Sequence, residues 1–158
     1  SATDKLTVVA AVTKNSDAAT GLVLELTAST STNNGAFYLG APNDVTNRLS
    51  FVNKGTSQSS ALTTAASYSA PVSAVLLGVG DIAADICTLS VGGAQVGSHT
   101  NDQGTGNYSN ATLYVLSRAG TSFRFNGRFY GSTGRFGPMS DSERSNLTRW
   151  WQKRIGTA

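Results

Sequence analysis

The sequence has few of the side chains with which enzymes usually carry out chemistry. Its 158 residues include one cysteine (Cys87), one histidine (His99) and only two glutamates, Glu25 and Glu143. A single cysteine excludes an internal disulfide bond, and a zinc site would require more histidine and cysteine than the chain contains. Retaining glycosidases need two carboxylates about 5 Å apart, and the sequence has no E-x-D-x-E pattern that would pair them. We therefore expect no catalytic site.

Charge and long apolar runs are also scarce. Charged residues make up 13% of the chain, whereas about 25% is usual. No apolar run is long enough to cross a bilayer, and no secretory signal pattern is visible. Glycine, serine, threonine and asparagine are abundant instead, which is typical of an all-β extracellular or virion protein. We expect that location, with no insertion into a membrane.

The basic residues are concentrated in the last part of the chain. The formal net charge is +3, and eight of the twelve lysines and arginines lie from Arg118 onward. This concentration favours an acidic partner such as nucleic acid or an anionic glycan, and it also fits a solvated basic face without a partner. The eight residues are Arg118, Arg124, Arg128, Arg135, Arg144, Arg149, Lys153 and Arg154.

Apolar runs of strand length recur along the whole chain. The clearest pair is Ile86–Val91 and Ala94–Ser98, joined by Gly92-Gly93, because both central residues of a type I′ hairpin turn need a positive φ. Strands at this spacing predict a single domain with the architecture of a sandwich or barrel. We expect strands at positions 6–13, 21–28, 36–39, 48–53, 57–62, 71–79, 86–91, 94–98, 113–117 and 123–136.

The C-terminal segment carries the one convincing helix signal. Ser140 and Glu143 have the spacing of a capping box, in which each satisfies a backbone N–H of the other, and Gly156 is placed to end the helix. The apolar residues between them recur at helical spacing, at positions 147, 150, 151 and 155. We expect Leu147 and one of the two tryptophans to be buried against a sheet.

Four motifs, in this order, resemble a known type of domain. They are Asp85–Val96 (DICTLSVGGAQV), Asp102–Tyr108 (DQGTGNY), Phe125–Gly131 (FNGRFYG) and Met139–Arg144 (MSDSER). The order is similar to that of laminin-G-like, concanavalin A-like domains, in particular those of phage and prophage tail proteins. The resemblance implies an antiparallel two-sheet jelly-roll sandwich with one C-terminal α-helix over residues 1–158. It also implies a module cut from a larger virion protein, with glycan binding or an accessory role.

The glycine-rich loop in the second motif is our first candidate for a binding site. Asp102, Gln103 and Asn107 offer polar groups for sugar hydroxyls, and the ring of Tyr108 offers a flat surface on which a sugar could stack. Glycines let backbone amides approach a ligand closely. We expect this loop to contact a saccharide.

The run Phe123–Tyr130 supplies the second half of the predicted site. Side chains alternate between the two faces of a strand. Phe123, Phe125 and Phe129 should therefore face the core. The other face should then present two guanidiniums, an amide and a phenol, which suit an acidic polysaccharide unless the helix or another subunit covers them. The residues of that face are Arg124, Asn126, Arg128 and Tyr130.

Calcium is the one metal for which the sequence offers suitable ligands. Asn101, Asp102 and Asn107, or Asn43 and Asp44, carry hard oxygen atoms. Asparagine and aspartate also build turns without any metal, so we assign neither a metal nor a cofactor.

Two functions remain in view. The first is a non-catalytic module of a phage or prophage tail protein that binds a host-surface polysaccharide. If the arginines take part in binding, this polysaccharide should be anionic. The second is a structural or decoration domain that contacts only other virion proteins. We expect a glycan rather than nucleic acid as the partner, and a homo-oligomer is compatible with either function.

Overall fold

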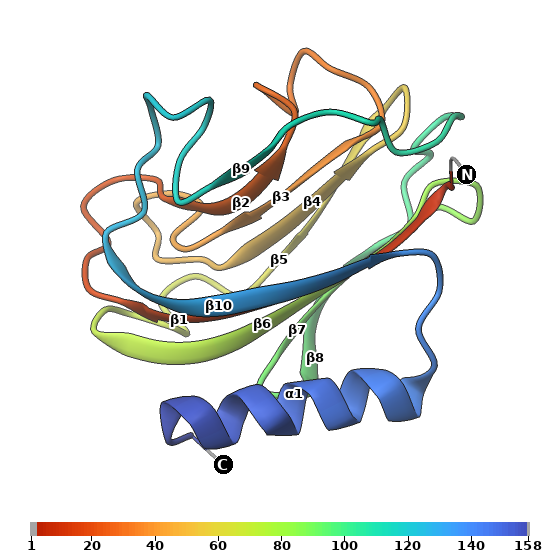
Figure 1. Cartoon of the computed structure of the whole chain (residues 1–158). Coiled ribbons are helices and arrows are strands. Elements are labelled where there is room, and N and C mark those ends of the chain that lie inside the picture. Colours follow the sequence, from red (N-terminus) through yellow and green to blue (C-terminus); the bar gives the residue numbers. More distant parts are fainter. Residues whose placement is uncertain (1–2, 158) are drawn as a thin grey trace.

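The computed structural model describes residues 3–157 as two five-stranded antiparallel sheets with one helix outside them (Figure 1). The lower sheet has the strand order β10-β1-β6-β7-β8, and the upper sheet has the order β5-β4-β3-β2-β9. The strands are β1 (Lys5–Lys14), β2 (Leu22–Leu26), β3 (Ala36–Gly40), β4 (Ser50–Lys54), β5 (Gln58–Leu62), β6 (Val72–Asp81), β7 (Ile86–Val91), β8 (Ala94–His99), β9 (Leu113–Val115) and β10 (Gly127–Phe136), and the helix is α1 (Asp141–Ile155). The predicted all-β sandwich with a C-terminal helix is confirmed.

The main core lies between the two sheets. Alternate residues of β1, which include Leu6 and Val8, face the upper sheet and pack with its aromatic residues Phe37 and Phe51. The thiol of Cys87 is also buried there, and burial raises the pKa of this thiol to about 11, so it is unreactive at neutral pH. The predicted hairpin between β7 and β8 is present, with φ values of 59° and 91° at its two glycines.

A second apolar layer lies between the lower sheet and α1. The other alternate residues of β1, Val9 and Ala11, contact the buried ring of Trp151, and Leu147 is half-buried beside them. Gly131 on β10 lies directly against the same ring, so that a Cβ atom there would overlap it. Trp150 is exposed, so Trp151 is the tryptophan that packs on the sheet.

The ends of α1 follow from local sequence. The hydroxyl of Ser140 accepts a hydrogen bond from the Glu143 amide, the Glu143 carboxylate accepts one from the Ser140 amide at 2.7 Å, and Gly156 ends the helix with a φ of 72°. The predicted capping box is therefore confirmed. Within residues 3–157, no helix is long and apolar enough to cross a membrane.

The last strand begins later than predicted. Phe123 has a φ of +47°, which breaks the extended backbone, and the strand starts only at Gly127. A β-bulge between Ala11 and Val12 leaves Tyr130 without a directly paired residue on β1. The assignment of Phe123 to the core is wrong, since this ring is exposed. Phe129 does pack against the main core, and Tyr130 packs under α1.

Replacement of Trp151 by alanine should lower the free energy of unfolding by about 3–5 kcal/mol, because it opens a cavity between α1 and the lower sheet. Chemical denaturation monitored by far-UV circular dichroism measures the effect. The matched control is Trp150→Ala, which removes an exposed ring from the same helix and should cost much less. Equal losses in both variants would contradict this packing.

Candidate functional site

Tyr108 is a core residue, and its ring offers no surface to a ligand. Its side chain is 5% exposed and packs edge-on against Phe37, with the ring centroids 6.3 Å apart. Its hydroxyl donates a hydrogen bond to Asn53 Oδ1, and the Asn53 amide in turn donates to Gln103 Oε1. Burial raises the pKa of Tyr108 far above its ordinary value. The prediction of a stacking platform at Tyr108 is therefore wrong.

The rest of this loop closes one end of the sandwich. Gln103 is buried. Its backbone amide donates to Asp85 Oδ1 at 2.8 Å, and its backbone carbonyl accepts from the Ser57 amide at 3.0 Å. Asp102 accepts from the Gly104 amide at 2.6 Å, which makes a local Asx turn. The Asn107 carbonyl lies against Gly35, where any Cβ atom would collide with it. Buried hydrogen bonds and close backbone contacts thus account for most of the polar groups of the loop, while Gln103 Nε2 is buried without a hydrogen-bond partner in the described chain.

The two halves of the predicted site lie at opposite ends of the molecule. The amide of Tyr108 bonds the carbonyl of Thr3, just before β1 begins, whereas Asn126 accepts from the amide of Asn15, just after β1 ends. A strand of ten residues such as β1 spans about 30 Å. One saccharide unit cannot contact both groups.

The second half of the predicted site is itself divided. Arg124 is exposed on the loop between β9 and β10, beside Leu22 of β2. Arg128, also exposed, lies over the ring of Tyr130 at 5.1 Å, and Tyr130 reaches towards α1. The helix therefore covers part of the face that sequence periodicity assigned to a ligand.

A different cluster stands out on the outer face of the upper sheet. Glu25, in the middle of β2, is fully buried although its neighbours Leu24 and Leu26 point into the main core on the opposite face. Arg118 holds its carboxylate through Nε, at 3.1 and 2.9 Å from the two oxygens, and through Nη2 at 2.9 Å. The amide and hydroxyl of Thr30 donate to the same carboxylate at 2.8 and 2.9 Å. The carboxylate of this ion pair is buried and accepts several hydrogen bonds, as a buried charge requires.

Aromatic rings surround the ion pair. Glu25 is paired in register with Tyr38 on β3 and with Tyr114 on β9, so all three side chains project from the same face. The guanidinium of Arg118 lies 4.7 Å above the exposed ring of Phe123. In Figure 1 the loop that carries Arg118 and Phe123, between β9 and β10, rises above this sheet. We call the group Glu25, Tyr38, Tyr114, Arg118 and Phe123 the outer-face cluster.

The outer-face cluster has the chemical groups that sugar recognition needs. Arg118 is held rigidly by Glu25, its side chain is 21% exposed, and its Nη1 has no hydrogen-bond partner among residues 3–157. This nitrogen can donate to a carboxylate or hydroxyl oxygen, while Phe123 offers a ring face beside it. Burial raises the pKa of Tyr38 to about 12, so its hydroxyl stays protonated and donates to Asn43 Oδ1 at 3.0 Å.

The sequence contains a signal for this cluster that our prediction did not use. A glutamate in the middle of the apolar run LVLEL must be paired if the strand is buried on both faces. The sequence does not reveal the partner, because Arg118 is 93 residues away.

The two aspartates among the possible calcium ligands are engaged in turns and an ion pair. Asp44 is bound by the Arg48 guanidinium and accepts from the Thr46 amide at 2.9 Å, and Asp102 makes the Asx turn described above. Within the described part of the chain, no three His, Cys, Asp or Glu side chains lie close enough together to hold a metal ion.

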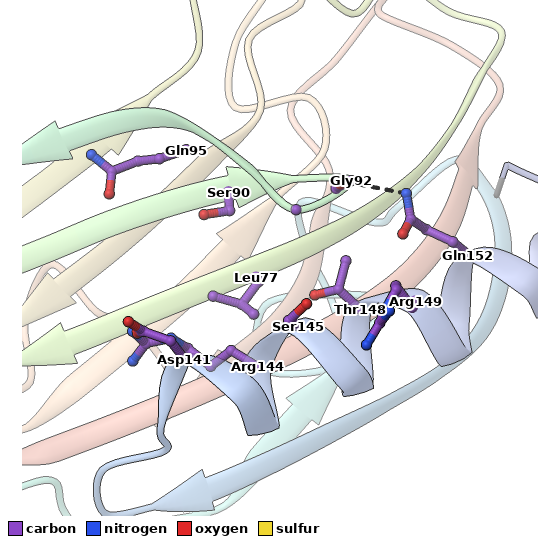
Figure 2. A pocket seen from close by; sticks show the side chains of 11 residues that line it. Leu77, Ser90, Gly92, Gln95, Asp141, Arg144, Ser145, Thr148, Arg149 and Gln152 are labelled. Carbon is purple, nitrogen blue, oxygen red and sulfur yellow. Dashed lines mark hydrogen bonds and ion pairs between the residues drawn. The ribbon is translucent and has the colours of Figure 1, made fainter.

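A groove of about 460 Å³ separates α1 from the hairpin of β7 and β8 (Figure 2). Gln152 bridges it by donating to the Gly92 carbonyl at 3.2 Å. The cations that line it are engaged within the helix, Arg144 with Asp141 and Arg149 with Asn146 Oδ1 at 2.6 Å. The groove is therefore a weaker candidate for ligand binding than the outer-face cluster.

The sequence matches no protein-family profile and no curated protein. The fold, however, is similar to that of solved lectin-like domains. The CBM40 domain of the Ruminococcus gnavus IT-sialidase, bound to α2,3-sialyllactose, aligns with 93% of this chain and 83% of its own, at a TM-score of 0.69 and 18% identity. A heptameric SAP-like pentraxin from Limulus polyphemus aligns with 93% of this chain and 70% of its own, at a TM-score of 0.67 and 11% identity.

The same fold also occurs inside larger proteins. The NanB sialidase of Streptococcus pneumoniae aligns with 90% of this chain but only 24% of its own length, at a TM-score of 0.67 and 18% identity. At these identities the similarity concerns the fold, and the protein is a jelly-roll sandwich of the concanavalin A-like type. The fold implied by the sequence resemblance is thereby confirmed, and the phage-tail setting stays a prediction.

Replacement of Tyr108 by phenylalanine should lower the free energy of unfolding by about 1–3 kcal/mol, because it leaves the buried Asn53 Oδ1 without its donor. Urea denaturation measures the change. Tyr68→Phe is the control, since the Tyr68 hydroxyl has no hydrogen-bond partner in the described chain. If Tyr108→Phe were neutral, the hydrogen-bond network that closes this end of the sandwich would not have the role that we assign to it.

Proposed function

We propose that this protein is a non-catalytic glycan-binding module and that its outer-face cluster binds an acidic sugar unit. The observation that carries the proposal is the guanidinium of Arg118, fixed by Glu25 with Nη1 free beside the exposed ring of Phe123. A donor that is held in place before binding loses little conformational entropy when a ligand arrives. A flat ring next to such a donor is suited to the apolar face of a sugar.

The preference for an acidic sugar is inferred from the charges around the cluster. Glu25 and Arg118 neutralise each other, so this pair orients a ligand without attracting one by net charge. Arg124 follows Phe123 in the same loop and is exposed, and within residues 3–157 its side chain donates only to the Gly120 carbonyl, at 3.3 Å. Its charge would favour a carboxylate or sulfate near Phe123.

The ligands of the structural neighbours support the same class of ligand. The CBM40 domain binds α2,3- and α2,6-sialyllactose, and cell entry of botulinum neurotoxin type C, which contains a similar fold, depends on interaction with two ganglioside molecules. Sialylated glycans carry a carboxylate on a sugar ring, which matches an arginine beside an aromatic ring. We take a sialylated or otherwise carboxylated glycan as the first ligand to test.

A binding role fits the cluster better than hydrolysis. Glycoside cleavage requires a pair of carboxylates that reach the scissile bond. Glu25 is fully buried beneath Arg118 and Thr30 and cannot approach a substrate. The cluster can therefore hold a sugar but has no accessible acid to cleave it.

We further propose that the module belongs to a phage or prophage tail protein and recognises a polysaccharide on the host surface. The four motifs of the sequence resemblance support this setting, as does the low charge content typical of virion proteins. A structural role in contact with other virion proteins is the second candidate. The specific observation in its favour is an open sheet edge on the molecule, formed by β9 and β10.

The binding test compares 3′-sialyllactose with lactose by isothermal titration calorimetry. The wild type should bind the sialylated sugar more tightly, and its affinity should fall as added salt screens Arg124. Arg118→Lys should weaken binding about tenfold, which corresponds to about 1.4 kcal/mol, because lysine keeps the charge but lacks the planar fork that can hold Glu25 on one edge and a ligand on the other. Phe123→Ala should weaken binding as well.

The control is Arg149→Ala, which removes a positive charge from the exposed face of α1, remote from the upper sheet. It should leave the affinity unchanged. Failure of the wild type to bind any acidic glycan on a broad array would refute the proposal. Binding that tolerates both Arg118→Lys and Phe123→Ala would move the site elsewhere.

A further inference from the structure

An uncharged groove lies beside the outer-face cluster. Its volume is about 410 Å³, which falls within the size range of small-molecule sites. Its walls come from the end of β2, the turn that leads to β3 and the segment before β9, and none of its lining residues carries a charge. The polar residues that line it are Thr27, Asn33, Asn34, Ser109, Thr112 and Tyr114.

Most of the polar groups in this groove are not used by the fold. Within residues 3–157, the side chains of Asn34 and Thr112 and the hydroxyl of Tyr114 make no hydrogen bond. Asn33 donates through Nδ2 to the Ser29 carbonyl at 2.9 Å, which fixes its amide and leaves Oδ1 without a partner. Turn formation therefore explains one of these groups, and the others are available to the hydroxyls of a ligand.

One of the lining residues has a buried hydroxyl without a partner. Thr27 is 6% exposed, and its Oγ1 makes no hydrogen bond in the described chain. Its backbone amide is bonded to the Thr112 carbonyl at 3.0 Å, so the two threonines are held on neighbouring segments. Buried polar groups are nearly always hydrogen-bonded, and a water molecule or a ligand hydroxyl in the groove would satisfy this one.

The groove continues the outer-face cluster along β2. Tyr114 belongs to both, because it lines the groove and is paired in register with Glu25 across the β2–β9 ladder (Figure 1). Phe123 lies at the start of β2, where its carbonyl accepts from the Leu22 amide at 2.9 Å. Thr27 lies at the other end, two residues beyond Glu25, which is roughly 7 Å along a strand. The aromatic ring, the ion pair and the groove thus follow one another on the same face.

We infer that this groove is a second subsite, which binds an uncharged hexose unit next to the acidic unit held by the outer-face cluster. The inference rests on the proposed function for the acidic unit, and it adds that the ligand is an oligosaccharide rather than a single acidic sugar. The hydroxyls of a neutral sugar both donate and accept, which matches the groups on Asn33, Asn34, Thr112 and Tyr114. An acidic unit would find no cation among the residues that line the groove.

Isothermal titration calorimetry with two ligands tests the inference. The methyl glycoside of sialic acid carries the acidic unit alone, whereas 3′-sialyllactose adds neutral hexoses. The wild type should bind 3′-sialyllactose at least about tenfold more tightly. Asn34→Ala should weaken binding of 3′-sialyllactose about fivefold, because it removes a neutral hydrogen bond. Thr112→Trp fills the groove and should abolish the preference, and neither variant should change the affinity for the methyl glycoside.

Lactose alone tests the groove without the acidic unit. In an NMR titration with ¹⁵N-labelled protein, lactose should shift the side-chain amide signals of Asn34 and the backbone amide signal of Thr112. Arg118→Lys should show the same shifts, because the groove does not need the guanidinium. If lactose gives these shifts while no acidic glycan binds, the subsite stands and the proposed function fails. If acidic glycans bind but the wild type shows neither the shifts nor the preference for 3′-sialyllactose, the subsite is overturned and the proposed function stands.

The matched control is Thr64→Trp, which makes the same substitution at an exposed position on the loop between β5 and β6, outside the groove. It should leave the preference for 3′-sialyllactose and the lactose shifts unchanged. Thr112 and Asn34 are also exposed, so circular dichroism should show an unchanged fold in all three variants. Loss of the preference in Thr64→Trp, or its persistence in Thr112→Trp, overturns the inference.

Discussion

Burial of β1 on both faces is the constraint on which the other elements depend. The middle of its sequence, KLTVVAAVTK, is the apolar run VVAAV, and nearly every side chain of the strand is excluded from water. An apolar face of a sheet must be covered by another element, so the lower sheet needs the upper sheet on one side and α1 on the other. Trp151 supplies most of the second cover and fits because Gly131 leaves room for its ring.

The same constraint explains why α1 covers only part of the lower sheet. The outer face of β7 presents Thr88 and Ser90, and Gln95 follows on β8, so this half of the lower sheet tolerates water. The helix consequently lies over β1 and β6, and a polar groove remains beside the β7–β8 hairpin (Figure 2). The position of the only helix in the described chain is thus decided by the pattern of apolar residues across the strands.

Two buried polar groups have opposite consequences for function. Around Tyr108, the phenol hydroxyl, the Asn53 amide and the Gln103 side-chain oxygen form a chain of hydrogen bonds inside the molecule, and the loop from Asp102 to Tyr108 closes the end of the sandwich. Around Glu25, the partner is the long side chain of Arg118, which is partly exposed. Its guanidinium contacts Glu25 through Nε and Nη2, and Nη1 remains for a ligand. The Glu25 carboxylate has its full set of partners while Arg118 keeps a donor at the surface, whereas around Tyr108 the side-chain nitrogen Nε2 of Gln103 is buried without a partner in the described chain.

Local patterns in the sequence determined the sandwich architecture, the Gly92-Gly93 hairpin and the capped helix. Each depends on residues a few positions apart, whose geometry is set by φ preferences, side-chain alternation and helix capping. Tertiary structure alone decided the candidate site. Tyr108 is buried in the main core with its hydroxyl bonded to Asn53, 55 residues away, and Glu25 pairs with Arg118, 93 residues away. The positive φ at Phe123 and the β10 bulge at Tyr130 then divided the predicted ligand face, because side-chain alternation holds only while the backbone stays regularly extended.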